Sequence, residues 1–286
     1  MVKKMLMMSV LLTVYLHAGA QTMEAYTLFD SKGKKVSWKK LMKETSNSEL
    51  VFFGEFHNNP ISHWLQFELC KSLHEETKIN LGAEMIEADN QDELNDFLQG
   101  SIDAEDLDSL ARLWPNYDTD YAPLVEFAKE NGITFVATNI PRRFAHMVYK
   151  NGGFSALDSL SVEEKSWVAP LPIQFDANLP QYQKILEMMQ DHATPELVQA
   201  QAIKDATMAY FIVMNLREQH TFIHLNGAFH SDFHEGILWY VHLQRPEINA
   251  ITISTVEQED ISSLNEEHIG RADFIICVDK DMTKTY

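Results

Sequence analysis

Short apolar runs alternate with longer amphipathic stretches along most of the chain. The runs are continuous and rich in β-branched and aromatic residues, which is typical of strands buried on both faces of a parallel sheet. The predicted strands span residues 50–53, 79–85, 133–138, 221–225, 250–254 and 274–278. Apolar residues at helical spacing predict helices over residues 60–74, 92–98, 123–131 and 141–150. This order predicts an α/β protein with a mostly parallel sheet flanked by helices.

The segment from about residue 151 to 220 departs from this order because it lacks a strand-like run. Its pattern predicts two helices, over residues 181–190 and 195–217. Thr194 has the character of an N-cap before Pro195, and apolar residues recur at helical spacing after it. We therefore expect one α/β domain over residues 21–286, with a smaller helical subdomain inserted at about 151–220.

The first twenty residues have the layout of a secretory signal peptide. Lys3 and Lys4 precede an apolar run, and the small residues 18–20 form a cleavage signal. The run is too short for a retained membrane-spanning helix, and no later segment predicts one. We expect an exported protein that is periplasmic, secreted or associated with the cell surface.

The acidic composition argues against some classes of binding partner. The formal net charge is −19 at pH 7, which argues against nucleic acids and anionic membranes because both require clustered Lys and Arg. The two cysteines, Cys70 and Cys277, lie far apart in the sequence. They could form a disulfide in an oxidising compartment or remain buried thiols, and the sequence leaves both open.

Two Gly-x-x-His turns are the strongest indication of chemistry. Gly54 to His57 follows the first predicted strand, and Gly227 to His230 follows the fourth. The glycines would let the backbone turn sharply off each strand. Because ligands of open α/β sheets bind at the carboxyl ends of the strands, both histidines are expected on the functional edge.

Carboxylates follow the same strands. Two histidines with one or two carboxylates form a donor set for a divalent metal such as zinc, manganese or iron. The candidate metal ligands are His57, His230, Glu55 and Glu84, and the two glutamates are also candidate catalytic groups of a metal-dependent hydrolase. Each residue has a simpler alternative: His57 could cap the next helix, and Glu84 could be a solvated loop residue.

Several established motifs are absent from the sequence. It contains no Gly-x-Ser-x-Gly elbow, Walker loop, Gly-x-Gly-x-x-Gly or His-Glu-x-x-His. It also lacks a Cys-x-x-Cys-His attachment motif, so any haem would be held non-covalently.

Taken in order, these motifs resemble the ChaN-like haem-binding family of the Tiki superfamily. The resemblance covers roughly residues 45 to 245. It rests on residues 51–60, 83–85, 114–115, 120–125, 137–142, 201–209 and 226–236.

This resemblance implies a parallel sheet with a smaller helical domain and a role in haem or iron uptake. It also implies non-covalent haem near a dimer contact, a tyrosine ligand to the iron, and an uptake receptor or transporter as partner. Several family members are lipoproteins, whereas this chain has no cysteine near the predicted cleavage site. The wider superfamily includes proteins proposed to be metal-dependent proteases, which matches the paired Gly-x-x-His turns.

The helical region supplies the candidate haem contacts. Tyr149 and Tyr182 are candidate iron ligands from their position there, and Arg142 or Arg143 could meet a propionate. Three functions remain open at this point: a haem-binding protein of haem or iron uptake, a metal-dependent hydrolase of the peptidase type, and a carrier without catalysis or haem that holds another ligand in the same cleft. Whether the protein is an enzyme is undecided from the sequence.

Overall fold

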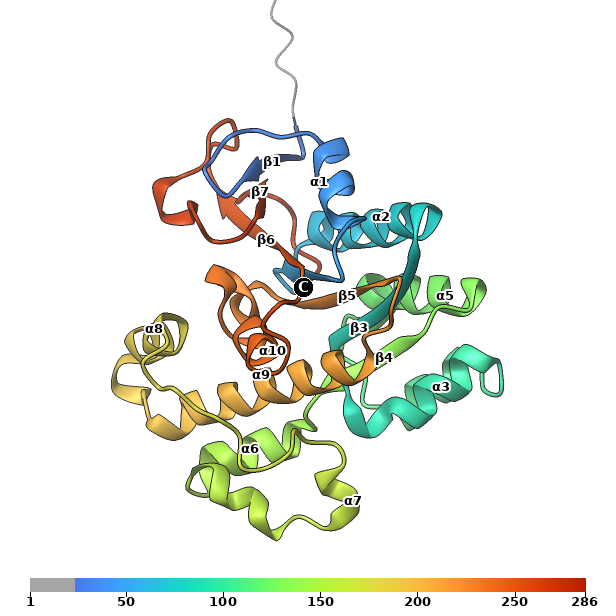
Figure 1. Cartoon of the computed structure of the whole chain (residues 1–286), viewed down its shortest axis with the longest axis vertical. Coiled ribbons are helices and arrows are strands. Elements are labelled where there is room, and N and C mark those ends of the chain that lie inside the picture. The colour runs from blue at the N-terminus through green and yellow to red at the C-terminus, as the bar shows by residue number, and fades with distance from the viewer. Residues whose placement is uncertain (1–23) are drawn as a thin grey trace, which may run out of the picture.

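The computed structural model describes residues 24–286, so the predicted signal peptide lies outside the described residues. Seven strands form one sheet in the order β1-β7-β6-β2-β5-β3-β4 (Figure 1). The strands are β1 (Tyr26–Asp30), β2 (Leu50–Glu55), β3 (Lys78–Glu87), β4 (Phe135–Asn139), β5 (His220–Gly227), β6 (Ala250–Gln258) and β7 (Phe274–Asp279). All neighbours are parallel except β1, which pairs antiparallel with β7 at one edge. The predicted α/β class is therefore confirmed.

The helices fill the connections between the parallel strands. They are α1 (Trp38–Thr45), α2 (Pro60–Glu76), α3 (Gln91–Gln99), α4 (Ala104–Leu110), α5 (Ala122–Asn131), α6 (Arg142–Lys150), α7 (Val162–Lys165), α8 (Pro180–Met189), α9 (Pro195–Asn215) and α10 (Ile237–Gln244). Asn59 caps α2 by accepting from the backbone N–H groups of Ile61 and Ser62 at 3.1 Å. Asn59 thus takes the capping role that the sequence left open for His57.

Two apolar layers bury the central strands from opposite sides. Helices α2, α3 and α5 pack on one face, where Leu69 and Val125 meet strand residues such as Phe53. Helices α9 and α10 cover the other face, where Ile212 and Val241 pack in the same cluster as Phe52. Alternate residues of β2 therefore face different layers, which explains why its sequence is apolar without alternation.

The segment between β4 and β5 contains helices and no strand. Thr194 caps α9 and accepts a hydrogen bond from the backbone N–H of Leu197 at 3.2 Å, as its sequence predicts. Helix α6 and the following 3-10 turn over Gly153–Ser159 pack against α9 in a separate apolar cluster. The helical region is thus joined to the sheet through α9, which contacts both (Figure 1).

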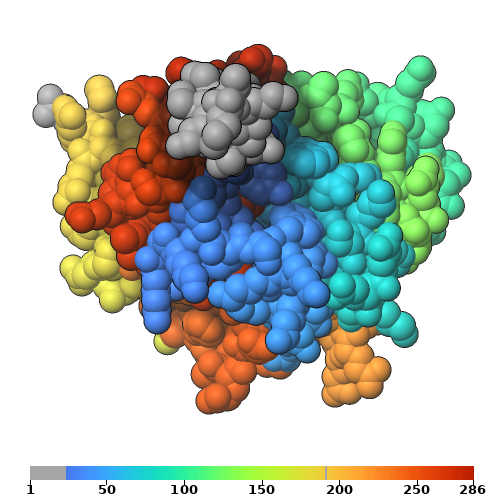
Figure 2. All heavy atoms as spheres, turned by 90° about the horizontal axis from the view of Figure 1, so that it is seen from above, coloured from blue at the N-terminus to red at the C-terminus, as the bar shows by residue number. Residues whose placement is uncertain are grey.

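The first and last strands of the described chain pair at one edge of the sheet, whereas the residues after β7 return towards the end of β2, where the Thr285 N–H donates to the Asn58 carbonyl oxygen at 3.0 Å. Tyr26 pairs with Val278 and Asp30 with Phe274. Figure 2 shows the N-terminal segment, in blue, beside C-terminal segments in red. Both cysteines are buried and unpaired. No helix within residues 24–286 combines the length and apolar character needed to cross a membrane.

Candidate functional site

The carboxyl edge of the sheet gathers the side chains that the two Gly-x-x-His turns predict. Strand β5 lies between β2 and β3, and Glu55 at the end of β2 is in register with Gly227 at the end of β5. Glu84 reaches this edge from β3 and accepts a hydrogen bond from the Gly227 N–H at 2.7 Å. The structure therefore brings Glu55, His57, Glu84 and His230 to one place, as the strand order requires.

His230 lies in a buried chain of hydrogen bonds. Its Nε2 is 3.2 Å from Glu84 Oε1, and its Nδ1 contacts Asp205. Tyr182 donates from its hydroxyl to the other oxygen of Asp205 at 2.8 Å. Both ring nitrogens of His230 therefore face carboxylate oxygens.

These contacts decide the charge state of the buried pair. Burial alone would lower the pKa of His230, but Glu84 and Asp205 outweigh it and raise that pKa to about 10. Burial likewise opposes ionisation of Glu84, yet His230, His57 and the Gly227 N–H hold its pKa well below the usual range. Near neutral pH the pair is an imidazolium and a carboxylate.

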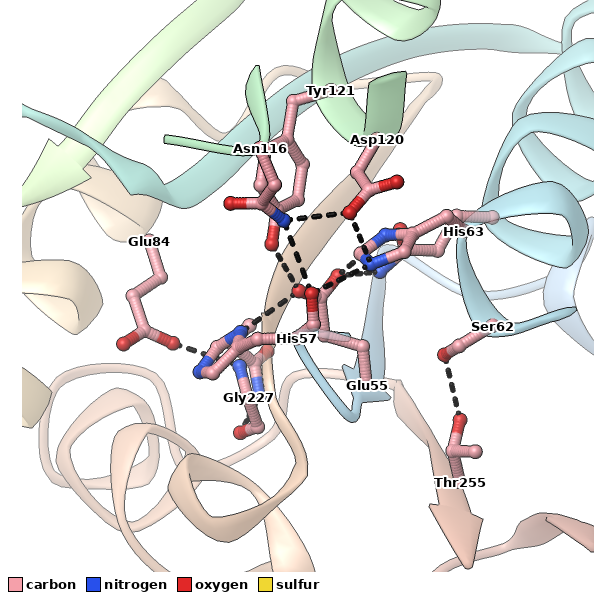
Figure 3. Close-up of polar contacts among 12 residues, drawn as sticks. Glu55, His57, Ser62, His63, Glu84, Asn116, Asp120, Tyr121, Gly227 and Thr255 are labelled. Carbon is pink, nitrogen blue, oxygen red and sulfur yellow. Dashed lines mark hydrogen bonds and ion pairs between the residues drawn. The ribbon is translucent and has the colours of Figure 1, made fainter. Parts of the chain in front are cut away.

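His57 belongs to a second network centred on Glu55 (Figure 3). Its Nδ1 lies 2.9 Å from Glu55 Oε1. Tyr121 donates to the same oxygen at 2.6 Å, and Gln66 donates to the other oxygen. Burial opposes the charge of His57, but the Glu55 hydrogen bond and the Glu84 charge prevail and raise its pKa. Glu55 is thus almost inaccessible to solvent and held by several donors.

A π-helical turn over Tyr117–Tyr121 contributes side chains to this second network. This turn supplies Tyr121 and also Asp120, which accepts from Asn116 at 2.7 Å. His63 of α2 belongs to the same network, and its Nε2 lies 3.1 Å from the His57 carbonyl oxygen. Such π turns are frequent at functional sites because they redirect side chains within a helix.

Glycine is required where the two turns approach each other. A Cβ at Gly227 would lie 2.8 Å from His57 Nε2, so any larger residue would displace that imidazole. A Cβ at Gly54 would lie 2.8 Å from the Ala228 Cα and 3.0 Å from the Ile253 carbonyl oxygen, both of them backbone atoms. The glycines therefore permit close backbone packing at this edge.

The four predicted metal ligands do not form a metal-ligand cluster. Among residues 24–286, no group of three or more His, Cys, Asp or Glu side chains is placed to hold a metal ion. The reason is local: both nitrogens of His230 face carboxylates, and both oxygens of Glu55 accept hydrogen bonds. The candidate ligand atoms are already engaged by one another and by neighbouring side chains, so the geometry does not support a metal site.

A cleft of about 1340 Å³ opens above this edge, between the strand ends and the helical region. Three helices each present one face to it, with lining residues at helical spacing. These residues are Arg142, Arg143 and His146 of α6, Ile185, Met188 and Met189 of α8, and Leu197, Gln201 and Lys204 of α9. Glu55, His57, Glu84 and His230 form part of its floor.

The cleft is lined by five Arg and Lys side chains and four Asp and Glu side chains, whereas the chain as a whole is strongly acidic. Arg112 is paired with Glu87 at 3.1 Å, and Arg143 is paired with Asp89. Arg142 and Lys204 form no ion pair with any side chain that the structure describes. These two cations are free to meet an anionic ligand.

The predicted haem contacts are divided between cleft and core. Arg142 and Arg143 line the cleft, whereas Tyr149 and Tyr182 are not among its lining residues. Tyr182 is almost fully buried, and its hydroxyl is bonded to Asp205. Tyr149 packs at the edge of the α6 cluster, with the Lys150 ammonium 4.1 Å from its ring centre. The structure therefore does not place either tyrosine at the cleft surface.

Stability should depend on pH through His230. Folding raises the pKa of His230 from its ordinary value of about 6.5 to about 10. Its stabilising contribution is complete below about pH 6.5 and is lost as the pH rises through the folded value, by at most about 1.4 kcal/mol per pH unit. We expect urea denaturation to show a falling free energy of unfolding between about pH 7 and 10. The His230→Gln variant should show a shallower slope, and an equal slope would contradict the assignment.

Comparison with known proteins identifies a family whose model matches this chain. A family model described as haem-binding uptake, Tiki superfamily, ChaN, matches residues 41–241. The match includes both Gly-x-x-His turns and the three helices that line the cleft.

The individual proteins that resemble this chain have low sequence identity to it. A chloroplastic protein of Arabidopsis thaliana, RETICULATA-RELATED 5, is 24% identical over 199 residues, which cover 64% of this chain and 26% of that protein. This chain thus spans about a quarter of that relative's length. A solved structure described as cofacial heme binding to ChaN of Campylobacter jejuni has a TM-score of 0.66 at 16% identity, covering 89% of this chain and 97% of that one. A Bacillus cereus protein has a TM-score of 0.52 at 11% identity, over 89% and 95% of the chains. These likenesses concern the fold.

Proposed function

The chain belongs to the ChaN family of haem-binding uptake proteins in the Tiki superfamily, and from this premise we propose that it binds haem non-covalently in the cleft above the sheet. The observation that carries the proposal is the cleft itself. Its volume of about 1340 Å³ exceeds the roughly 300–1000 Å³ of ordinary small-ligand pockets. A porphyrin is a large, flat, apolar ligand, and this space suits it.

The chemistry of the lining fits the same ligand. Trp114, Phe229, Ile185 and other apolar side chains offer contact surface for a macrocycle. Haem also carries two propionates, which require cationic or hydrogen-bonding partners. Arg142 and Arg143, the two candidates from the sequence, and Lys204, which the sequence did not suggest, supply such partners from two helices of the cleft wall.

The family and the N-terminal sequence support a proposal for the cellular role. We place the protein outside the cytoplasm, periplasmic, secreted or at the cell surface, because residues 1–20 have the pattern of a signal peptide. There it would take part in haem or iron uptake, delivering haem to a receptor or transporter. We also propose that the protein forms a homodimer. The helical region would form the roof of the cleft.

We do not propose a metal-dependent hydrolase as a second function. Its four residues do lie together, but their donor atoms are engaged with one another and with neighbouring side chains. The buried pair of Glu84 and His230 instead fixes the floor of the cleft.

A haem titration of the purified full-length chain tests the proposal. We expect a saturable shift of the Soret band at micromolar haem, with one haem per chain or per dimer. Met188 and Met214 make a matched pair because 66% and 64% of their surfaces are exposed, and of the two only Met188 lines the cleft. Met188→Asp should weaken binding, whereas Met214→Asp should leave it unchanged. No band shift in the unmodified protein, or equal effects of the two variants, would remove the proposal.

A further inference from the structure

A cluster of lysines covers one end of this acidic molecule. Residues 31–43 contain six lysines and no Asp or Glu, whereas the rest of the chain carries 17 Lys and Arg against 42 Asp and Glu. The net charge argued against anionic membranes for want of clustered cations, and these residues supply such a cluster. All six are exposed, and we call them the lysine patch: Lys32, Lys34, Lys35, Lys39, Lys40 and Lys43.

Two elements carry the lysine patch, and Asp30 joins them. Lys32 and Lys34 lie in the turn after β1, where their backbone N–H groups donate to Asp30 Oδ1 at 3.1 and 3.0 Å. The Lys40 ammonium of α1 lies 3.9 Å from the other oxygen of the same carboxylate. The turn and the helix therefore meet at one carboxylate, and their lysines share one surface. This segment, in blue, lies on the face that Figure 2 shows.

Helix α1 is arranged against its own electrostatic preference. Its first turn contains no acidic residue and carries Lys39 and Lys40, although the positive end of the helix dipole repels cations. Lys39 and Lys43 are four residues apart, so two like charges are neighbours on the helix surface. Lys35 and Lys40 have long ion pairs of 3.6–3.9 Å, and the other four lysines have none with side chains that the structure describes. An anionic partner would relieve this repulsion.

An exposed apolar side chain lies beside the lysine patch. Ile269, in the connection between β6 and β7, is 46% exposed, and a Cβ at Gly33 would lie 3.7 Å from its Cδ1. The Gly270 N–H donates to the Ser31 carbonyl oxygen at 2.8 Å, which holds this connection against the turn. Lysines next to an apolar side chain suit the boundary of a lipid bilayer, where headgroup phosphates attract ammonium groups and apolar side chains reach the acyl region.

We propose that the lysine patch docks on an anionic phospholipid surface. Lysine ammonium groups are flexible point charges, which match headgroup phosphates that lie in a plane without fixed geometry. At about 0.15 M salt the Debye length is about 8 Å, so acidic side chains farther from the surface are largely screened. Figure 1 shows α1 and β1 at one end of the molecule and α6 and α7 at the other. Docking thus leaves the helical region that borders the cleft directed away from the lipid.

Vesicle sedimentation tests the proposal. The protein is residues 21–286, which contain every described element and lack the apolar run of the predicted signal peptide. The probes are vesicles of phosphatidylglycerol, which is anionic, and of phosphatidylcholine, which is neutral. We expect binding to the anionic vesicles alone, and its loss between about 0.1 and 1 M salt, where the Debye length falls from about 10 to 3 Å. Lys39→Ala combined with Lys43→Ala should weaken binding by about 25-fold, because each lysine near an anionic surface contributes about fivefold.

A matched double variant controls for total charge. Lys150 and Lys165 are exposed lysines of α6 and α7, so alanine at both positions removes the same charge at the opposite end of the molecule and should leave binding unchanged. Equal losses in the two double variants, or equal binding to both kinds of vesicle, would overturn the proposal. Light scattering without lipid tests the other anionic partner, an acidic face of a second copy. A smaller assembly in the Lys39 and Lys43 variant, with no vesicle binding by the unmodified protein, would replace the lipid by that contact.

Discussion

The Glu84→Ala variant is expected to lose about 3–5 kcal/mol of its free energy of unfolding, because removing one partner of a buried ion pair leaves the other charge uncompensated. Glu84 is buried, and its two oxygens are engaged by His230 at 3.2 Å and by the Gly227 N–H at 2.7 Å. Alanine would leave the imidazolium with Asp205 alone and the backbone N–H without its acceptor. The side chain that ties β3 to β5 at the cleft floor would be gone.

Chemical denaturation of the variant and the unmodified protein measures this difference. Glu84→Gln keeps the shape and can still accept from the Gly227 N–H, so its loss should be smaller than that of alanine. Glu187→Ala removes an exposed carboxylate of α8 and should change stability by less than about 0.5 kcal/mol. A loss below about 1 kcal/mol for Glu84→Ala would show that the pair contributes little to the fold.

The central strands could be predicted because their burial dictates their composition. Each of the six predicted runs lies largely within one of the strands β2 to β7, for example residues 50–53 within Leu50–Glu55. Strand β1 was missed since it is an antiparallel edge strand of five residues, outside the strand–helix alternation that marks parallel sheets. Helix α1 was missed for a related reason: it is only eight residues long.

The candidate site was predicted only where strands deliver its side chains. Glu55, Glu84 and the paired turns follow from the rule that parallel strands end at the same edge. Asp205 and Tyr121 come from α9 and a π-helical turn, and they join the site through tertiary packing that no local pattern encodes. Position in the sequence also does not give the direction of a side chain: Tyr182 lies in the helical region as expected, and its hydroxyl donates to Asp205 in the core.

Haem affinity is expected to fall by about 100-fold or more when Arg142 and Lys204 are both replaced by alanine. Hydrogen bonds to charged groups contribute roughly 1.5–3 kcal/mol each, and each 1.4 kcal/mol is about tenfold in affinity. Arg142 and Lys204 lie on α6 and α9, so they approach the cleft from separate elements. Each single variant should therefore lose about tenfold, with the two effects nearly additive.

The change in net charge needs its own control, because haem is an anion and the chain is already acidic. Lys78 and Arg217 are exposed cations near the amino end of the sheet, where β3 begins at Lys78. Alanine at both positions removes the same charge as the cleft variant, at the edge opposite the cleft. Titrations at low and high salt should show that only the cleft variant loses most of the salt dependence of binding, because the propionate contacts are electrostatic. Equal losses of affinity in the two double variants would mean that overall charge, rather than the position of Arg142 and Lys204 in the cleft, governs haem binding.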